Sequence, residues 1–130
     1  MKSDTFQINT TPAEIISFVG APANLIDILP ADRIEQWKSD GNTCSFKIKG
    51  LAHIDLVLDS VTDTQITYIS NSEKPFPFKL KITATQDDAG KSSLSAEFDP
   101  EVNAFMATMI KTPMTNFLNH LGSAISNRFK

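Results

Sequence analysis

Residues 99–130 read DPEVNAFMATMIKTPMTNFLNHLGSAISNRFK, and this stretch decides how the rest of the chain is expected to fold. Asp99 is a good N-cap, and Pro100 suits the first helical position because its missing amide hydrogen would have no partner there. The apolar residues that follow recur at spacings of three and four: Val102, Met106, Met109, Ile110, Pro113, Met114, Phe117, Leu121, Ala124 and Ile125. The pattern predicts one long helix, about 45 Å in length, with an apolar side that covers another layer of the protein.

Pro113 interrupts the middle of this helix. A proline there removes the hydrogen bond to the Met109 carbonyl, which predicts a kink. The kink either lets a long helix follow a curved sheet or, together with the freed carbonyl, serves as a gate. Phe105 lies outside the apolar stripe, so we expect it to be exposed, as a protein contact or as an isolated surface aromatic.

The N-terminal segment predicts a strand followed by two short helices. Residues 3–10 alternate in character, as a strand does, and the letters TPAE at 11–14 supply an N-cap threonine, a first-turn proline and the glutamate of a capping box. Gly20 is expected to end this first helix. A second short helix is expected after Ala21-Pro22, and Pro30 stops it.

The middle of the chain, residues 31–98, predicts antiparallel strands separated by turns every 8 to 12 residues or so. Alternation places one set of side chains on a single inward face: Cys44, Phe46, Ile48, Ile54, Leu56, Leu58, Ile66, Tyr68, Phe78, Leu80, Ile82, Leu94, Ala96 and Phe98. In the strand around Asp32–Lys38, Ile34 and Trp37 have opposite parity, so both point inward only if the strand contains a bulge. We leave the inward face of that strand open. The prediction is an α+β fold in which a seven-stranded antiparallel sheet wraps around the C-terminal helix.

Length, charge and cysteine content narrow the class of protein. A chain of 130 residues is expected to form a single domain. Its 12 basic and 15 acidic residues are mixed along the sequence, which argues against a nucleic-acid partner. No apolar run reaches about 18 residues and no signal peptide is visible, so we expect no membrane span and a cytoplasmic location. Cys44 is the only cysteine, which excludes an intramolecular disulfide.

The order of strand, two short helices, six strands and long C-terminal helix resembles the START-like (SRPBCC) superfamily, which includes pollen allergens, lipid-transfer domains and polyketide cyclases. The local marks are the TPAE sequence at 11–14, the segment from Asn24-Leu25 to Leu29-Pro30, and Asp99-Pro100. The resemblance implies a helix-grip fold and a small hydrophobic molecule or lipid bound between sheet and helix. The glycine-rich loop of the plant allergens is not visible, so their plant-hormone ligands are not implied.

The candidate ligand site is the interior between this helix and the sheet. We expect eight residues to line a cavity there: Leu56, Tyr68, Phe78, Leu80, Met106, Met109, Ile110 and Phe117. Phe76, in the aromatic segment 74–78, is expected at the cavity mouth or packed against its rim. A filled core would produce the same alternating pattern. The Tyr68 phenol needs a buried partner, either the polar end of a ligand or a backbone group.

The inventory of catalytic groups is poor, and no metal or other cofactor is predicted. His53 falls on the solvent face, and His120 is a lone histidine near the chain end without the paired spacing of a metal site. Cys44 is expected to be buried and inert. The ambiguous strand could bring Glu35 inward beside Arg33, or Gln36. Three functions follow: a non-enzymatic binder of a hydrophobic ligand, which we favour, a protein-interaction module with a filled core, and a cyclase-like enzyme that uses Glu35 or Tyr68.

Overall fold

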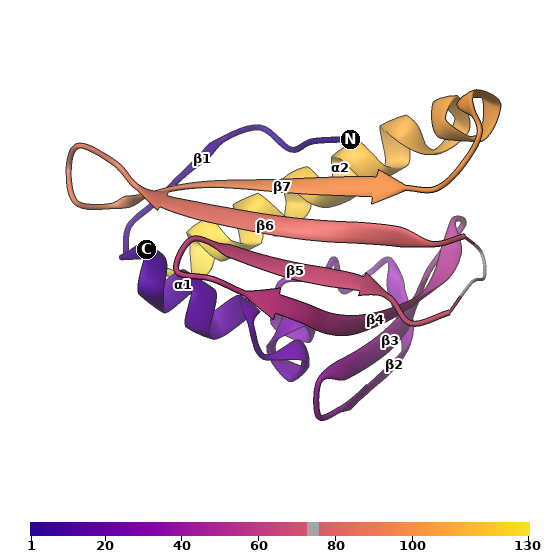
Figure 1. Cartoon of the computed structure of the whole chain (residues 1–130), viewed down its shortest axis with the longest axis horizontal. Helices are drawn as coiled ribbons and strands as arrows, with labels where there is room; N and C mark the ends of the chain where they lie inside the picture. Colours follow the sequence, from indigo (N-terminus) through magenta and orange to yellow (C-terminus); the bar gives the residue numbers. More distant parts are fainter. Residues whose placement is uncertain (73–75) are drawn as a thin grey trace.

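The computed structural model of the protein describes residues 1–72 and 76–130. The elements in chain order are β1 (Phe6–Ile8), α1 (Pro12–Val19), the 3₁₀ helix η1 (Pro22–Asp27), β2 (Ile34–Asp40), β3 (Thr43–Ile48), β4 (Ala52–Val61), β5 (Gln65–Ser70), β6 (Phe78–Gln86), β7 (Ser92–Pro100) and α2 (Ala104–Arg128). The strands form one antiparallel sheet in the order β1-β7-β6-β5-β4-β3-β2 (Figure 1). This confirms the predicted seven-stranded helix-grip architecture.

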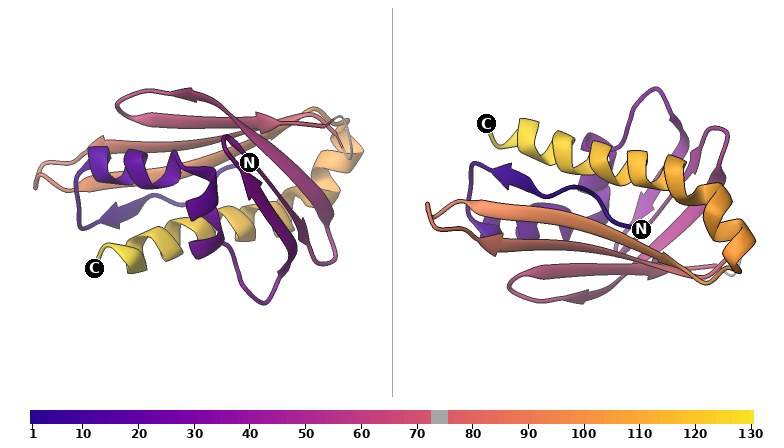
Figure 2. Two further views of the ribbon diagram at one scale, coloured as in Figure 1. Left: turned by 90° about the horizontal axis from the view of Figure 1, so that it is seen from below. Right: turned by 90° about the horizontal axis from the view of Figure 1, so that it is seen from above.

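The sheet curves around α2, which lies along one of its faces (Figure 2). The helices α1 and η1 close the end of the molecule at which α2 finishes, and Phe18 of α1 meets Phe129 edge to face with ring centroids 6.0 Å apart. Arg128 lies over the same Phe18 ring at 4.2 Å and pairs with Asp27 at 3.8 Å. These contacts fasten the C-terminal end of α2 to the connection between β1 and β2.

Strict alternation in β6 and β7 explains why one face of the sheet is apolar. Leu80 pairs with Phe98 and Ile82 with Ala96, and all four side chains are buried. The intervening Lys79 lies on the opposite, exposed face. Burial of each large apolar side chain contributes about 1.5–3 kcal/mol, so this face fixes the register of the strands.

The predicted start of α1 is confirmed in its position. The Thr11 hydroxyl accepts a hydrogen bond from the Glu14 amide at 3.4 Å, and Gly20 is the C-cap. The Glu14 carboxylate accepts instead from the hydroxyl of Thr10, outside the usual capping-box geometry. The second helix is a single 3₁₀ segment that ends at Asp27, before the predicted stop at Pro30.

The predicted start of α2 at Asp99 and Pro100 is wrong. Pro100 is the last residue of β7, where it pairs with Phe78, and Asp99 pairs with Lys79. The helix is capped by Asn103, whose side chain accepts a hydrogen bond from the Met106 amide at 2.8 Å. The strand β7 therefore continues through Asp99 and Pro100. Its pairing with β6 outweighs the preference of an Asp-Pro pair for the start of a helix.

The open question in β2 is resolved by a bulge. The pairing register with β3 shifts between Glu35 and Lys38, and Gln36 has a φ of 59°. Ile34 and Trp37 are consequently both half-buried on the same side of the strand. The sequence allowed this arrangement only if the strand contained a bulge. Glu35 is exposed and pairs with Lys47 at 3.6 Å, so it does not point into the interior.

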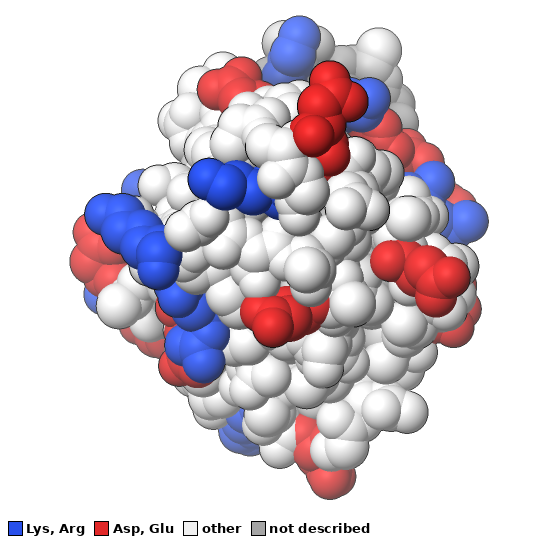
Figure 3. All heavy atoms as spheres, turned by 90° about the vertical axis from the view of Figure 1, so that its left-hand side faces the viewer, with Lys and Arg blue, Asp and Glu red and all other residues white. Residues whose placement is uncertain are grey.

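Side chains of both charges lie on the surface of the molecule (Figure 3). On the face drawn in Figure 3, Asp and Glu side chains are scattered over a mostly uncharged surface, and several Lys and Arg side chains lie in a row along its left side. In the part of the chain that is described, no helix is both long and apolar enough to cross a membrane.

Candidate ligand-binding site

Six of the eight predicted cavity-lining residues are buried in the continuous core. The six are Leu56, Tyr68, Phe78, Leu80, Ile110 and Phe117, none of them more than 8% exposed. They pack against one another and against the other inward-facing residues of the sheet. The face between sheet and helix is therefore largely filled by side chains, as in the alternative that the sequence left open.

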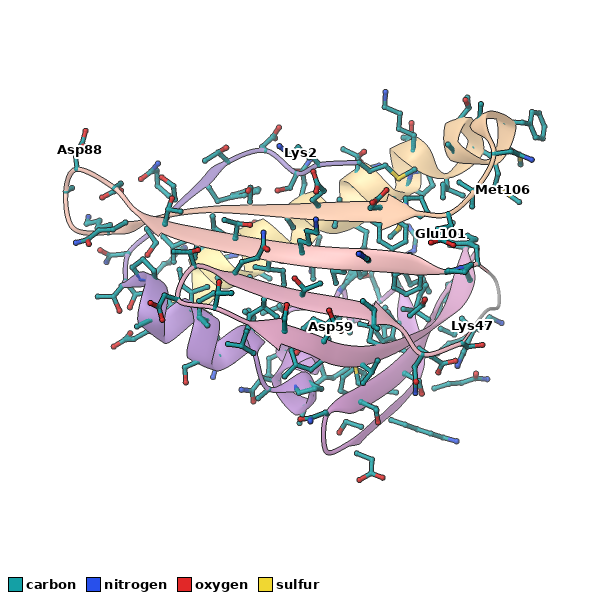
Figure 4. All side chains as sticks on the ribbon, viewed as in Figure 1. Lys2, Lys47, Asp59, Asp88, Glu101 and Met106 are labelled. Atoms are coloured by element: carbon teal, nitrogen blue, oxygen red, sulfur yellow. The ribbon has the colours of Figure 1, made fainter. Side chains whose placement is uncertain are left out.

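Met106 and Met109 are placed differently from the prediction. Their side chains are 41% and 61% exposed, and Phe105 beside them is 75% exposed. The first turns of α2 lie beyond the end of β7 (Figure 1), and Figure 4 shows Met106 at this projecting end. Met109 lies nine residues from the buried Leu118, or about 180° around the helix, so it faces away from the sheet. The expected exposure of Phe105 is confirmed.

A cleft of about 420 Å³ opens beside the middle of α2. Its other wall comes from the segment before β2, the end of β3 and the turn into β4. The lining residues are Pro30, Asp32, Arg33, Ile48, Gly50, Leu51, Thr112, Pro113, Asn116, Phe117 and His120. Among the described residues that line it, only Phe117 belongs to the predicted set.

Backbone hydrogen bonds hold the strand wall of the cleft together. The Lys49 amide donates to the Arg33 carbonyl at 2.8 Å, and the Arg33 guanidinium donates back to the Lys49 carbonyl at 3.2 Å. Gly50 then turns the chain with a φ of 76°, a conformation that glycine adopts without steric cost. The Leu51 amide donates to the Ile48 carbonyl at 3.0 Å and closes the turn. Arg33 and Leu51 are thereby fixed on the same wall.

The helix wall follows from residue spacing and from Pro113. Thr112, Asn116 and His120 are separated by four residues each, which places them on one side of α2. Pro113 lies within the helix and offers no amide hydrogen to the Met109 carbonyl. The helix bends in its first half, as Figure 2 shows, and the cleft lies beside this region. A role of the bend as a gate stays a prediction.

The floor of the cleft is apolar and its rim is polar. Ile48 and Phe117 are 4% and 8% exposed, whereas Arg33 and His120 are exposed at the edge. The Phe117 ring stacks on Phe46 with centroids 6.4 Å apart, and Phe46 stacks on Trp37 at 6.0 Å. A row of three aromatic rings thus connects the floor of the cleft with the only tryptophan of the chain.

Tyr68 has a structural partner. Its side chain is fully buried, and its hydroxyl donates to the Val19 carbonyl at 2.6 Å. A backbone partner was one of the two alternatives predicted for this phenol. Burial raises the pKa of the phenol, and the neighbouring Cys44 raises it further, so Tyr68 stays neutral and joins β5 to the end of α1.

Tyr68→Phe is expected to lower the free energy of unfolding by about 1–3 kcal/mol, because the Val19 carbonyl loses its buried donor. Thr108→Val is the matched control: the Thr108 hydroxyl donates to the Ala104 carbonyl at an exposed position, so its loss should change stability by less than about 0.5 kcal/mol. Urea titrations of the three proteins measure both values. Equal stability of Tyr68→Phe and the parent would show that the buried hydrogen bond contributes nothing.

The other titratable candidates lie away from the cleft or on its rim. Cys44 is 3% exposed, and burial, with a smaller contribution from Asp55, raises the pKa of its thiol to about 12, so the group is protonated at neutral pH. His53 is exposed and contacts Asp55 at 3.2 Å on the outer face. His120 lines the cleft. Residues 1–72 and 76–130 contain no group of three side chains that could hold a metal ion.

Phe76 packs at the edge of the core, whereas the sequence placed it at the mouth of the cavity or against the rim of the cavity. It is half-buried and meets Phe78 and Phe98 edge to face, with centroids 6.3 and 6.4 Å away. It is not among the residues that line the cleft. Lys74 and Pro75 of the same predicted aromatic segment lie outside the described residues.

The sequence contains little sign of the strand wall of the cleft. Its residues Pro30, Gly50 and Leu51 come from two turns that are 20 residues apart and share no motif. Leu51 follows a glycine and does not belong to the alternating apolar residues of either neighbouring strand. This position in the sequence is the one sign that Leu51 lies in a turn. The cleft forms only when the bulged edge of the sheet meets the bent helix.

Comparison with known proteins identifies the fold. No protein-family model matches the sequence, and no curated protein is significantly similar to it.

Several solved structures resemble this one over nearly the whole chain. XoxI from Bacillus cereus is 21% identical over 99% of this chain and 94% of its own, with a TM-score of 0.66. A START superfamily protein from Mycobacterium smegmatis is 13% identical over 99% of this chain and 95% of its own, with a TM-score of 0.69. Norcoclaurine synthase from Thalictrum flavum, in a point mutant bound to a transition-state analogue, is 11% identical over 99% of this chain and 92% of its own, with a TM-score of 0.77. The chain therefore has the START-like helix-grip fold that its sequence predicted.

Proposed function

We propose that the protein binds a small hydrophobic or lipid-like molecule in the cleft beside the bend of α2. The observation that supports this is a concave site of about 420 Å³ with an apolar floor and a few polar groups at its rim. Small-molecule sites typically have volumes of about 300–1,000 Å³, and this cleft combines buried apolar residues with five polar ones: Asp32, Arg33, Thr112, Asn116 and His120. Burial of the apolar part of the ligand against Phe117, Ile48 and Leu51 would supply the driving force.

Binding, rather than catalysis, is the proposed role. The two groups considered for a cyclase-like reaction do not line the cleft, since Glu35 is exposed beside Lys47 and the Tyr68 hydroxyl is bonded to Val19. The START-like fold supports a ligand site in general, and the norcoclaurine synthase structure holds a transition-state analogue. The ligand of this chain is proposed from its own cleft and not from that relative.

A bulky side chain introduced from the helix wall tests the site. Thr112 is exposed and lines the cleft, so Thr112→Phe should occupy part of its volume without altering the core. We expect the affinity for Nile red, a neutral hydrophobic probe, to fall at least about tenfold, which corresponds to about 1.4 kcal/mol. Probe fluorescence measures this affinity directly, and the change to Phe keeps Trp37 the only tryptophan as a second reporter.

Ser123→Phe is the matched control for this test. Ser123 is a small, exposed, polar residue of the same helix that does not line the cleft. Its substitution should leave the affinity for Nile red within about twofold of the parent value. Unchanged binding in Thr112→Phe, or an equal loss in both variants, would contradict the proposed site.

A further inference from the structure

We propose that the cleft selects hydrophobic carboxylic acids, with Arg33 and His120 as the groups that bind the carboxylate. This inference rests on the proposed function and names the chemical class of its ligand. The apolar part of such a molecule would lie against Phe117 and Leu51, and its head group would lie at the rim between the two walls of the cleft.

Arg33 has hydrogen-bonding capacity that the fold does not use. Its guanidinium carries five N–H donors, and the structure gives it one partner, the Lys49 carbonyl at 3.2 Å. In the described part of the chain the ion pairs are Lys47 with Glu35, His53 with Asp55, and Arg128 with Asp27, so Arg33 has no carboxylate partner there. The bond to Lys49 fixes the side chain on the strand wall and leaves other donors for a ligand.

The other arginine of the chain shows the contrast. Arg128 pairs with Asp27 at 3.8 Å and lies 4.2 Å from the Phe18 ring centroid, and it thereby joins α2 to the N-terminal helices. Its charge has a structural use. Arg33, by comparison, is an exposed cation on the rim of a cleft with an apolar floor, and the planar fork of an arginine matches the two oxygens of a carboxylate.

The helix wall adds donors opposite Arg33. His120 and Asn116 are four residues apart on α2 and both line the cleft. Each can donate a hydrogen bond from a ring nitrogen or an amide, and both are exposed at the rim. A carboxylate held between the two walls would therefore accept hydrogen bonds from both.

One carboxylate, that of Asp32, lies on the same rim and reduces the preference of the cleft for an anionic ligand. Asp32 lines the cleft and is exposed, and it forms no ion pair with the neighbouring Arg33. Its negative charge opposes an anionic ligand, and water and salt screen the effect because the residue is exposed. Removal of this charge should therefore strengthen the binding of an acid and leave that of a neutral ligand unchanged.

The experiment compares decanoate with decanol, which share a chain length and differ in the charge of the head group. We expect calorimetry of the parent protein to show at least about tenfold tighter binding of decanoate than of decanol, and this preference should shrink in high salt.

The variants test the individual residues. Arg33→Met should lower the affinity for decanoate about tenfold and leave the affinity for decanol within about twofold of the parent value. His120→Leu should weaken decanoate less, and Asp32→Asn should strengthen it. Lys91→Met removes an equal charge in the β6–β7 turn, which also contains Asp88 (Figure 4); Lys91 does not line the cleft, so this variant should alter neither affinity.

The possible results separate this inference from the proposed function. Equal affinities for the acid and the alcohol would overturn the inference while the proposed function stands. An equal loss of both ligands in Arg33→Met would also overturn it, because Arg33 would then act only through the wall that it forms with Lys49. Failure of both ligands to bind the parent protein would overturn the proposed function and the inference together.

Discussion

Leu118→Ala is expected to lower the free energy of unfolding by about 3–5 kcal/mol. The Leu118 side chain has no exposed surface, so its truncation removes buried apolar atoms and leaves a cavity that the surrounding core can fill only in part. The free energy of unfolding of a typical domain is about 5–15 kcal/mol, so this substitution would remove a large share of it. Urea titration followed by the fluorescence of Trp37 and by far-ultraviolet circular dichroism measures it.

Met109→Ala is the control for this prediction. Met109 precedes Leu118 by nine residues, which places the two on opposite sides of an α-helix with about 100° per residue. Its side chain is 61% exposed, and truncation there should change stability by less than about 0.5 kcal/mol. A large loss in Met109→Ala, with a small one in Leu118→Ala, would mean that α2 presents its other side to the sheet.

Gly122→Val is expected to lower the free energy of unfolding by about 2–3 kcal/mol. Gly122 is buried where α2 crosses β1, and a Cβ at this position would lie 2.3 Å from both Cδ2 and Cε2 of the Phe6 ring. Two further methyl groups add to the overlap, and overpacking of this kind typically costs about 1–3 kcal/mol. The same urea titration measures the loss, and Ser123→Val, at an exposed neighbouring position, shows the cost of a β-branched residue alone.

A double-mutant cycle between Phe6 and Gly122 identifies the cause of that loss. In the parent, Gly122→Ala should destabilise, since the contact with Phe6 outweighs the roughly 1 kcal/mol by which alanine favours a helix. In a Phe6→Ala background the ring is absent, so Gly122→Ala should stabilise. If the effect of Gly122→Ala had the same sign in both backgrounds, the contact with Phe6 would not be what requires glycine.

Those parts of the fold that rest on local periodicity could be predicted from the sequence. Leu80, Ile82, Ala96 and Phe98 alternate without interruption, and their faces and pairing follow from it. For β2 the sequence stated only a condition, that Ile34 and Trp37 share a face if the strand contains a bulge, and it left the inward face open. The start of α2 could not be predicted in the same way, since Asp99-Pro100 and Asn103 both suit a helix terminus and only the pairing with β6 decides between them.

The site depended on information that no local pattern carries. The three- and four-residue spacings of α2 admitted Met106 and Met109 to a broad apolar side, but the buried face is narrower and excludes Met109, and Met106 lies in the first turns of the helix, beyond the end of β7 (Figure 1). Leu56 and Phe78 were assigned correctly to the interior, and volume rather than polarity determines that they pack there instead of lining a space. Arg33 and Leu51 are brought to the same wall of the cleft by the turn at Gly50 and by the hydrogen bond from Arg33 to the Lys49 carbonyl. Neither contact can be read from the sequence.

The bulge in β2 has a consequence for how molecules of this protein meet one another. An open sheet has two outer strands whose free amide and carbonyl groups can pair with another chain, a common route to aggregation. Here one outer strand, β1, spans three residues, and the other, β2, is interrupted at Gln36 and followed by the exposed Lys38. The border at β2 therefore presents no long, flat row of backbone groups, and we expect the irregularity that turns Trp37 inward to hinder the pairing of this edge with another chain.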